Sequence, residues 1–430
     1  MAKRGPAAVA ICSTAFAALG RAQATALGYP ELPIAVIPHP FGSRTRDEVR
    51  QLAEQCIGEI VRLVCEAGPR DSSVVPNRSS LTERAALIKV PGDLDGLYSL
   101  FRERHWGDGL PVVPPTTERV ERMLCHSHRA ATEVVATVAP GFGAATIERI
   151  AANAVLAGCD PEYLPVLIAA VEAIAEPRFN LQGIQVTTNP AAPWLIVNGP
   201  IGKRLGVNSG VNCLGQGTCA NATLGRALRL ILQNIGGALP GEMDRATQGQ
   251  PGKYTFCCAE NEEMNPWEPL HVERGFAPEC SAITVVGGAS GTLNMNTHAK
   301  DADDLLRVIA DTMAHPTSND YWTGGEPWLV LAPEHAEILK RAGLSKSDVK
   351  RRLWEQSKMP AGRMAAKDRL RTGDARRAEL GEIGPDTMLP ISTQPELIGI
   401  VVAGGPGTHS VYVPTYGNSR SVTRKVVCNA

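Results

Sequence analysis

The N-terminal part of the chain alternates short apolar runs with amphipathic segments, and this order restricts the possible folds more than any other feature. Residues 6–11 are an apolar run, and Ser13 or Thr14 can cap a helix that Gly28 then ends. A second apolar run, residues 32–37, leads into another amphipathic segment. Strand, helix, strand and helix in this order predict two parallel strands joined by a right-handed crossover. The N-terminal part is therefore expected to be a small parallel α/β module.

The sequence beyond this module has the pattern of a larger mixed α/β domain. Apolar periodicity predicts helices at residues 147–157, 161–175, 218–235 and 301–314, and buried strands at 193–198, 282–286 and 397–403. The fold class of the whole chain is accordingly α/β.

The length of 430 residues exceeds the roughly 250–300 residues at which one hydrophobic core stops growing, so we expect more than one domain. Turn-forming residues predict a linker after the module, and a late basic stretch of helical pattern predicts a surface arm. The expected parts are a module at 1–67, a linker at 68–92, a large α/β domain at 93–338, a basic helical arm at 339–390, and a strand with a glycine-rich loop at 391–430 that completes the large domain.

Charge and hydropathy limit the classes of partner. Apolar residues make up 43% of the chain, charged residues 20%, and the formal net charge is −1. Such a chain has no overall field that attracts nucleic acid or an anionic membrane, and no apolar stretch approaches the roughly 18–20 residues of a membrane span. We therefore expect a small-molecule substrate and neither nucleic acid nor membrane as a partner. The basic arm and the extended linker favour a homo-oligomer.

The chain has eleven cysteines, an odd number spread over its whole length, which is not the pattern of a disulfide-rich secreted domain. Reduced thiols and a cytoplasmic location follow. Export is the alternative, because a basic start and Ala22-Gln23-Ala24 imitate a signal peptide. Gly20 and Arg21 interrupt that segment before the apparent cleavage site, and the predicted fold needs the first residues.

Cys12 is the sharpest candidate for chemistry. A thiol between the carboxyl end of a strand and the first turn of a helix faces unpaired backbone N–H groups, which favour the thiolate. Because parallel strands end at the same edge, His39 after the second strand could tune this thiol or act as a general base. The alternatives are that Cys12 is a small packing residue and that His39 is an exposed loop residue.

The sequence CSTA at residues 12–15, with ALGYPELP at 26–33 and IPHPF at 37–41, resembles the UGSC-motif family of selenoproteins and their cysteine homologues. The resemblance covers the N-terminal module and implies chalcogen chemistry at the position of Cys12, without a firm activity. In the family motif a second cysteine stands three residues on, where this chain has Ala15. A Cys-x-x-Cys disulfide cannot form within this motif, so the resemblance implies a lone nucleophilic or acid–base thiol.

Three later stretches also look like the larger uncharacterised proteins that carry such modules. They are residues 106–116 (WGDGLPVVPPT), 259–271 (AENEEMNPWEPLH) and 402–409 (VAGGPGTH). His409, which follows a glycine-rich turn after a predicted strand, is a candidate substrate-binding residue because ligands gather at this edge of open α/β sheets.

The second of these stretches places three acids within four positions, 260–263, where they repel one another unless a cation, a metal or a shared proton relieves them. A solvated acidic loop is the alternative. Two prolines around Trp267 fix the shape of the following loop, which a solvated linker would not need. We therefore expect Glu260 and Glu263 to be catalytic and His271 to line the same pocket.

A glycine-containing loop at residues 215–226 leads into a predicted helix, and its backbone N–H groups could hold a carboxylate or phosphate. It lacks the lysine of a P-loop and the spacing of a dinucleotide fingerprint, and tight glycine packing without a ligand is the alternative. Asparagine amides at nearby turns could add donors, although asparagine is common in turns. The candidate substrate-binding residues here are Asn198, Asn208, Gly215, Gly217, Asn221 and Arg226.

Three functions are consistent with these residues. The first is a thiol-dependent enzyme, of lyase or oxidoreductase type, in which Cys12 at a domain interface acts on a small anionic organic molecule while Glu260 or Glu263 moves protons. The second is a metal-dependent hydro-lyase or hydrolase that uses the acidic loop 260–263. The third is a non-catalytic binding protein. A run with Cys125, His126 and His128 lacks a second ligand pair at zinc spacing, so we predict no metal site there, and no cofactor is indicated.

Overall fold

The computed structural model describes residues 8–66 and 84–428. The N-terminal module has the predicted order of elements, and its two strands are parallel, with Cys12 opposite Val36. The connecting helix ends at Ala26 with Leu27 as its C-cap, after which Gly28 adopts a left-handed φ of +83°. Its elements are β1 (Ala10–Ser13), the 3-10 turn η2 (Thr14–Phe16), α1 (Ala17–Ala26), β2 (Ile34–Ile37) and α2 (Arg46–Glu66).

Residues 68–83, most of the predicted linker 68–92, lie outside the described residues. Residues 84–91 are exposed and form no helix or strand. Arg84 fastens this segment to the larger part of the molecule, because its Nε lies 2.6 Å from Glu148 Oε1 and its guanidinium also pairs with Glu121.

The larger part contains two four-stranded sheets. The first has the order β14-β7-β5-β6, in which β5 and β6 are parallel and the other neighbours antiparallel. The second has the order β12-β9-β13-β8, in which β12 and β9 are parallel. The strands are β5 (Ala192–Asn198), β6 (Cys257–Ala259), β7 (Ala282–Gly288), β8 (Leu293–Asn296), β9 (Trp328–Leu331), β12 (Gly399–Val402), β13 (His409–Val413) and β14 (Val422–Lys425).

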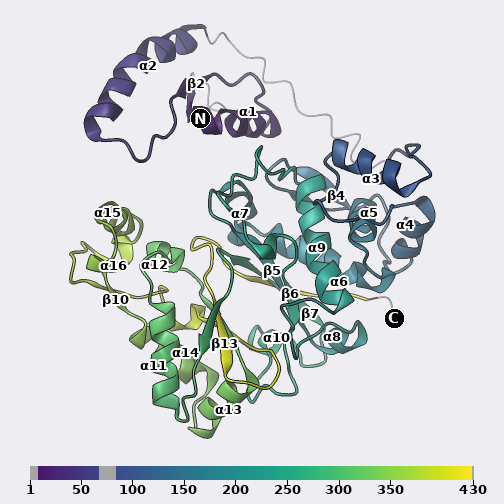
Figure 1. Cartoon of the computed structure of the whole chain (residues 1–430), viewed down its shortest axis with the longest axis vertical. Helices are drawn as coiled ribbons and strands as arrows, with labels where there is room; N and C mark the ends of the chain where they lie inside the picture. The colour runs from purple at the N-terminus through teal and green to yellow at the C-terminus, as the bar shows by residue number, and fades with distance from the viewer. Residues whose placement is uncertain (1–7, 67–83, 429–430) are drawn as a thin grey trace.

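The two sheets face each other across an apolar layer, and helices cover their outer faces (Figure 1). Successive residues of a strand point to opposite faces, so each buried strand serves two cores. In β5, Trp194 faces the layer between the sheets and Leu195 faces the helices. Trp194 and Trp328, one from each sheet, meet edge to face with their ring centroids 5.9 Å apart. The result is a four-layer mixed α/β arrangement of helix, sheet, sheet and helix.

Helices α5, α6 and α9 cover the first sheet, and α11, α13 and α14 cover the second (Figure 1). Apolar periodicity predicted α5, α6, α9 and α11, and both ends of each of these helices lie within three residues of the predicted ends. The helices are α3 (Leu94–Glu103), α4 (Thr117–Leu124), α5 (Ile147–Ala157), α6 (Leu164–Ile174), α7 (Leu181–Val186), α8 (Pro200–Arg204), α9 (Cys219–Asn234), α10 (Leu270–Glu273), α11 (Ala302–Met313), α12 (Asn319–Thr323), α13 (Pro333–Arg341), α14 (Lys346–Gln356), α15 (Ala366–Ala375) and α16 (Arg377–Leu380). Two small antiparallel strand pairs lie outside these sheets: the hairpin of β3 (Val134–Val138) with β4 (Gly143–Thr146), and β10 (Met359–Pro360) with β11 (Met388–Leu389), which α15 and α16 separate in the chain.

The basic stretch predicted to be a surface arm is built into the second half of the molecule. Val349 and Leu353 of α14 are buried in the core that α14 shares with α11. Lys346 and Lys350 are also buried, and both pair with Glu273. The basic composition therefore serves buried ion pairs as well as solvent contact, which a pattern of charges alone does not distinguish.

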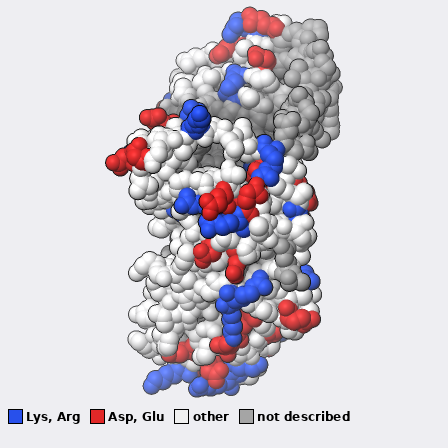
Figure 2. Space-filling model, turned by 90° about the vertical axis from the view of Figure 1, so that its right-hand side faces the viewer, with Lys and Arg blue, Asp and Glu red and all other residues white. Residues whose placement is uncertain are grey.

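Acidic and basic side chains are mixed over the face of the molecule shown in Figure 2, and neither sign covers it continuously. No helix among residues 8–66 and 84–428 is long and apolar enough to cross a membrane.

Candidate functional site

Two parallel strands of the first sheet end at the same edge, where a cavity of about 420 Å³ opens. In the pairing of β5 with β6, Val197 lies opposite Ala259. Since both strands run the same way, Gly199 and Glu260 leave the sheet on one side, and both line the cavity. This is the edge at which ligands gather in open α/β sheets.

Glu260 is the buried acid of this cavity, with 4% of its surface exposed. Its Oε2 accepts hydrogen bonds from Asn198 Nδ2 at 2.6 Å and the Leu270 amide at 2.7 Å, and its Oε1 accepts one from Asn265 Nδ2 at 2.8 Å. Burial raises the pKa of Glu260 to about 7, against the opposing effect of the Lys346 charge and the N–H donors. A carboxyl group with this pKa can both accept and release a proton near neutral pH.

Glu262 lies beside Glu260, and the side-chain amide of Asn198 forms hydrogen bonds with both carboxylates. Its Oε1 accepts hydrogen bonds from the Gly199 amide at 2.6 Å and from Asn198 Nδ2 at 3.0 Å. Asn198 Nδ2 therefore donates to both carboxylates and fixes their relative position. The Glu262 side chain remains 29% exposed and lines the cavity, so it is the carboxylate that a bound molecule can reach.

His271 lies behind Glu262 and is completely buried. Its Nε2 is 3.2 Å from the carbonyl oxygen of Pro278, which requires a proton on Nε2. Its Nδ1 has no hydrogen-bond partner among the described residues and faces Glu262 Oε1 at 3.6 Å. Two acceptors that face each other leave room for one more proton between them. The unpartnered Nδ1 of His271 therefore lies next to the one carboxylate that is partly exposed in the cavity.

Glu263 points to the solvent side of the same cavity. It forms an ion pair with Lys203 at the mouth, which lowers the pKa of Glu263 and raises that of Lys203. The sequence prediction named Glu263 as catalytic, but Glu262 is the acid that faces His271. The sequence signal for Glu262 is its position two residues after Glu260, directly after a strand.

The carboxylate oxygens in this cavity are occupied by N–H groups in a way that does not suit a metal ion. Both oxygens of Glu260 and one oxygen of Glu262 accept such bonds. In the described part of the chain, no group of three or more His, Cys, Asp and Glu side chains has a geometry that could hold a metal. The acidic loop therefore supports proton chemistry better than the metal-dependent alternative.

The asparagines and glycines of the predicted anion-binding loop are used to shape the loop itself. Asn221 Nδ2 donates to the carbonyl oxygens of Asn208, Cys213 and Cys257, and Asn221 Oδ1 accepts from the Asn208 amide at 2.7 Å. Gly215 lies so close to the Asn212 side chain that a Cβ would collide with it, and Gly217 has a left-handed φ of +112°. The structural alternative accounts for Asn208, Asn221 and both glycines.

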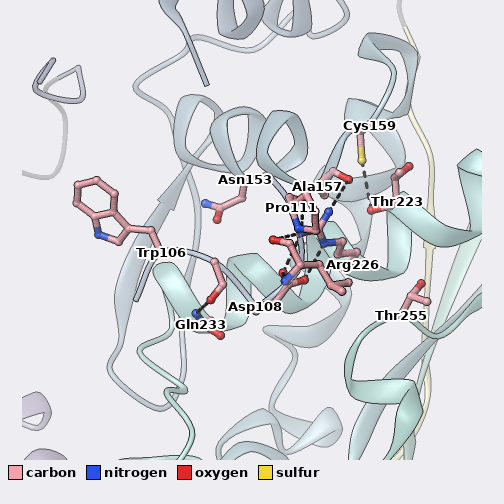
Figure 3. Close-up of polar contacts among 12 residues, drawn as sticks. Trp106, Asp108, Pro111, Asn153, Ala157, Cys159, Thr223, Arg226, Gln233 and Thr255 are labelled. Carbon is pink, nitrogen blue, oxygen red and sulfur yellow. Dashed lines mark hydrogen bonds and ion pairs between the residues drawn. The ribbon is translucent and has the colours of Figure 1, made fainter. Parts of the chain in front are cut away.

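Arg226 is likewise engaged inside the protein (Figure 3). Its Nε and NH2 lie 2.7 and 2.8 Å from the two carboxylate oxygens of Asp108. The same guanidinium donates to the carbonyl oxygens of Leu110, Pro111 and Ala157. Arg226 therefore holds the loop 106–116 against α9, which corrects its predicted role in binding substrate.

His409 begins strand β13 and is exposed. The glycine-rich turn before it lines another cavity, of about 610 Å³, through Gly404, Gly405 and Pro406. The His409 side chain is not part of that lining.

Cys12 is half-buried in the N-terminal module, with its sulfur against helix α1. A Cβ on Gly20 would lie only 2.7 Å from Cys12 Sγ, so the glycine makes room for the thiol. Gly20 is the fourth residue of α1, whereas the sequence placed the sulfur beneath the free N–H groups of the first turn. The sulfur therefore packs against the end of the first helical turn, at Gly20.

His39 lies at the same edge as predicted but contacts the residues that follow Cys12. Its Nδ1 shares a hydrogen bond of 3.1 Å with Ser13 Oγ, and its backbone amide donates to Thr14 Oγ1 at 3.2 Å. Neighbouring residues of a strand point to opposite faces, so an imidazole that meets Ser13 does not meet Cys12. The structure thus pairs His39 with a hydroxyl in place of the thiol.

A family model described as the UGSC family matches residues 1–66. These residues form a UGSC family domain. The match confirms the resemblance carried by the motif around Cys12, and it leaves residues 67–430 uncovered. Neither a curated protein nor a solved structure matches the chain.

The UGSC domain contacts the larger part of the molecule away from the β5–β6 cavity. Gln23 Nε2 donates to the Pro140 carbonyl at 3.0 Å, Gln182 Nε2 donates to Gln23 Oε1 at 2.7 Å, and Arg245 NH2 donates to the Ala15 carbonyl at 2.6 Å. In Figure 1 the UGSC domain lies at the top, while α8 and α10, which flank the cavity, lie in the lower half of the molecule.

The structure therefore divides these predicted catalytic and substrate-binding residues between two places. Asn198, Glu260, Glu263 and His271 gather at the β5–β6 cavity, where Glu262 joins them. Cys12 and His39 remain in the UGSC domain, and among residues 8–66 of that domain none lines this cavity or the one beside Gly404. The single site that would combine the thiol with the carboxylates is not formed.

Proposed function

We propose that this chain is a lyase-type enzyme that transfers protons on a small organic molecule in the β5–β6 cavity. The observation that carries the proposal is the meeting of Glu260, Glu262 and His271 at one cavity, with the pKa of Glu260 raised to about 7 by burial. General acid–base catalysis needs groups that exchange protons near the working pH within reach of the substrate.

The three residues have different roles in this proposal. Glu262 is the general base, because it is the partly exposed carboxylate in the lining. His271 receives or returns the proton through its Nδ1, which has no other described partner. Glu260 acts as the general acid, and Asn198, which donates to both carboxylates, is a positioning residue. Removal of a proton beside a carbonyl group by Glu262, with protonation of a leaving oxygen by Glu260, is a lyase reaction.

The charges of this cavity favour a neutral or cationic substrate group near the carboxylates. The lining contains Glu260, Glu262 and Glu263 against one cation, Lys203, which already pairs with Glu263. A carboxylate or phosphate on the substrate would be repelled here unless it lies near the mouth. The anionic molecule expected from the sequence fits a different cavity, considered below.

Exchange of substrate hydrogens in heavy water tests the proposal without knowledge of the product. A panel of small neutral and zwitterionic carbonyl and hydroxy compounds is incubated with the protein in D₂O, and loss of C–H signals is followed by NMR. Glu262→Gln should lower the exchange rate by about 10²–10⁴-fold, because the amide cannot accept the proton. Glu355→Gln is the control and should exchange at the wild-type rate, since Glu355 is exposed on α14 and does not line this cavity.

Two results would contradict proton transfer at this cavity. One is exchange by Glu262→Gln and His271→Gln at the rate of Glu355→Gln. The other is absence of exchange for every compound of the panel, with circular dichroism showing that the protein is folded.

A thiol reaction at Cys12 is the second candidate function, and the UGSC family match over residues 1–66 favours it. The sulfur is half-buried and rests against Gly20, where no side chain shields it. We infer that Gly20→Ala displaces the sulfur and changes the rate at which iodoacetamide alkylates Cys12. Ala18→Gly, an exposed position on the same helix, is the control. If wild-type Cys12 reacts no faster than exposed Cys65, measured by peptide mass spectrometry, the thiol is a packing residue.

We also infer a cytoplasmic location and a homo-oligomer. None of the eleven cysteines, all of which lie in the described residues, forms a disulfide, which supports a reducing compartment. Ile57, Val61 and Val64 expose an apolar strip on α2, which supports association of copies. Light scattering coupled to size-exclusion chromatography measures the mass in solution.

A further inference from the structure

A second cavity, of about 750 Å³, lies between helix α9 and the loop 239–254. It shares no lining residue with the β5–β6 cavity. Arg229 and Gln233 of α9, His105, and the loop residues Asp244 and Lys253 contribute its polar lining. A volume of this size suits a small organic ligand.

Two cations converge on one carboxylate in the lining. Lys253 Nζ lies 2.8 and 2.6 Å from the two oxygens of Asp244. Arg229 NH2 lies 3.3 Å from Asp244 Oδ2 and also donates to the Ala238 carbonyl, while its NH1 donates to Gln185 Oε1. Arg229 and Asp244 are more than nine-tenths buried. The site is thus built from buried charged groups rather than from flexible surface lysines.

The buried charges here leave one cation without a counter-charge. Asp108 also lines the cavity, and Arg226 neutralises it. Asp244 can balance Arg229 or Lys253 but not both. Glu242 is the remaining acid of the lining, and it is exposed to solvent. Burying an unbalanced charge is costly, so the group of Arg229, Lys253 and Asp244 favours binding of an anionic ligand.

The wall of the cavity is held in place without a ligand. Gln233 Nε2 donates to the carbonyl oxygens of His105 at 2.9 Å and Gly107 at 2.8 Å, and Asn234 Nδ2 donates to the Trp106 carbonyl at 3.0 Å. His105 adopts a left-handed φ of +55°, which is uncommon for a residue with a side chain. Figure 3 shows Gln233 and the clasp of Arg226 on Asp108 along the same helix. The loop is therefore preorganised.

We propose that the α9 cavity binds a small organic oxyanion, a carboxylate or a phosphate ester, on Arg229 and Lys253. Guanidinium and ammonium groups at one point offer charge-assisted hydrogen bonds to such oxygens. Burial lowers the pKa of both Arg229 and Lys253, and a bound anion would stabilise their charged forms. The site stands independently of the proton-transfer proposal, because the two cavities have no residue in common.

Isothermal titration calorimetry with citrate and with inorganic phosphate, at constant ionic strength in chloride, tests the proposal on the full-length protein. Lys253→Gln should weaken binding by about tenfold or more, because the unbalanced cation is gone. Asp244→Asn should strengthen binding, because the anion then takes the place of the missing carboxylate. Lys300→Gln, at an exposed position, is the control and should bind as the wild type does.

Opposite effects of Lys253→Gln and Asp244→Asn are the result that a merely structural charge cluster would not produce. Binding of citrate alone identifies a carboxylate site, and binding of phosphate alone identifies a phosphate site. The proposal is wrong if neither anion binds the wild type, or if Lys253→Gln and Lys300→Gln bind equally. If Asp244→Asn does not fold, the comparison of Lys253→Gln with Lys300→Gln still decides.

Discussion

The β5–β6 cavity and the α9 cavity solve the problem of buried charge in opposite ways. In the first, N–H groups and one shared amide surround two carboxylates, Glu260 and Glu262, and a histidine acceptor faces them. In the second, Arg229 and Lys253 surround one carboxylate, Asp244. The first arrangement has two carboxylates and no buried cation in its lining, and the second has two cations around one carboxylate. The carboxylates of the first cavity can therefore exchange protons, and the two cations around Asp244 in the second can bind an anion.

The largest change in the free energy of unfolding is expected from Asp108→Asn, which tests the charge balance of the α9 cavity. Asp108 balances Arg226, and both side chains are nearly inaccessible to water. Breaking such a pair leaves a buried charge uncompensated and should lower the free energy of unfolding by about 3–5 kcal/mol. Urea denaturation followed by circular dichroism measures the change.

Asp303→Asn is the matched control for that substitution. Asp303 also pairs with an arginine, Arg352, at 2.7 Å, but 87% of its side chain is exposed. The control should change stability by less than about 1 kcal/mol. Similar losses for the two variants would show that Arg226 is compensated by other groups and that the charge count of the α9 cavity is incorrect.

Local sequence patterns predicted the elements of the fold well. The module of β1, α1, β2 and α2 followed from apolar runs and a terminal glycine, because these are short-range effects. The packing of two sheets face to face did not follow, because it depends on which of Trp194 and Leu195 faces which core. Periodicity marks a strand as buried on both sides but does not name the two partners.

The candidate site was predicted in part for a similar reason. Glu260, Asn198 and His271 were found because acids and amides near strand ends are unusual, and the parallel strands bring them together. The α9 cavity was missed because Lys253 and Asp244 come from an irregular loop. Arg226 was misassigned because its partner Asp108 is 118 residues away in the sequence.

The pH dependence of stability should show the second largest effect, at Glu260. Its pKa rises from 4.5 to about 7 on folding, so the folded protein binds more protons than the unfolded chain between these values. Stability therefore falls as pH rises through this window, by up to about 3 kcal/mol from this group. Subtracting the urea stability curve of Glu260→Gln from that of the wild type isolates the contribution.

A difference between wild type and Glu260→Gln that stays flat from pH 5 to about 7.5 would mean that the three N–H donors keep Glu260 ionised. In that case the acid of the proposed mechanism would have to be another group, while Glu262 and His271 could still act as the base.

The smallest expected effect has the opposite sign and belongs to Lys253. Burial lowers its pKa, so between that lowered value and the unfolded value near 10.4 the unfolded chain binds more protons than the folded protein. Stability should therefore rise with pH in this range, and the rise should be absent from Lys253→Met. The effect is smaller than that of Glu260 because the Asp244 carboxylate stabilises the charged form of Lys253.

Saturating citrate should reduce this rise of stability with pH further, since an anion on Lys253 restores the charged form. A pH slope unchanged by citrate, in a protein that binds citrate by calorimetry, would place the anion away from Lys253.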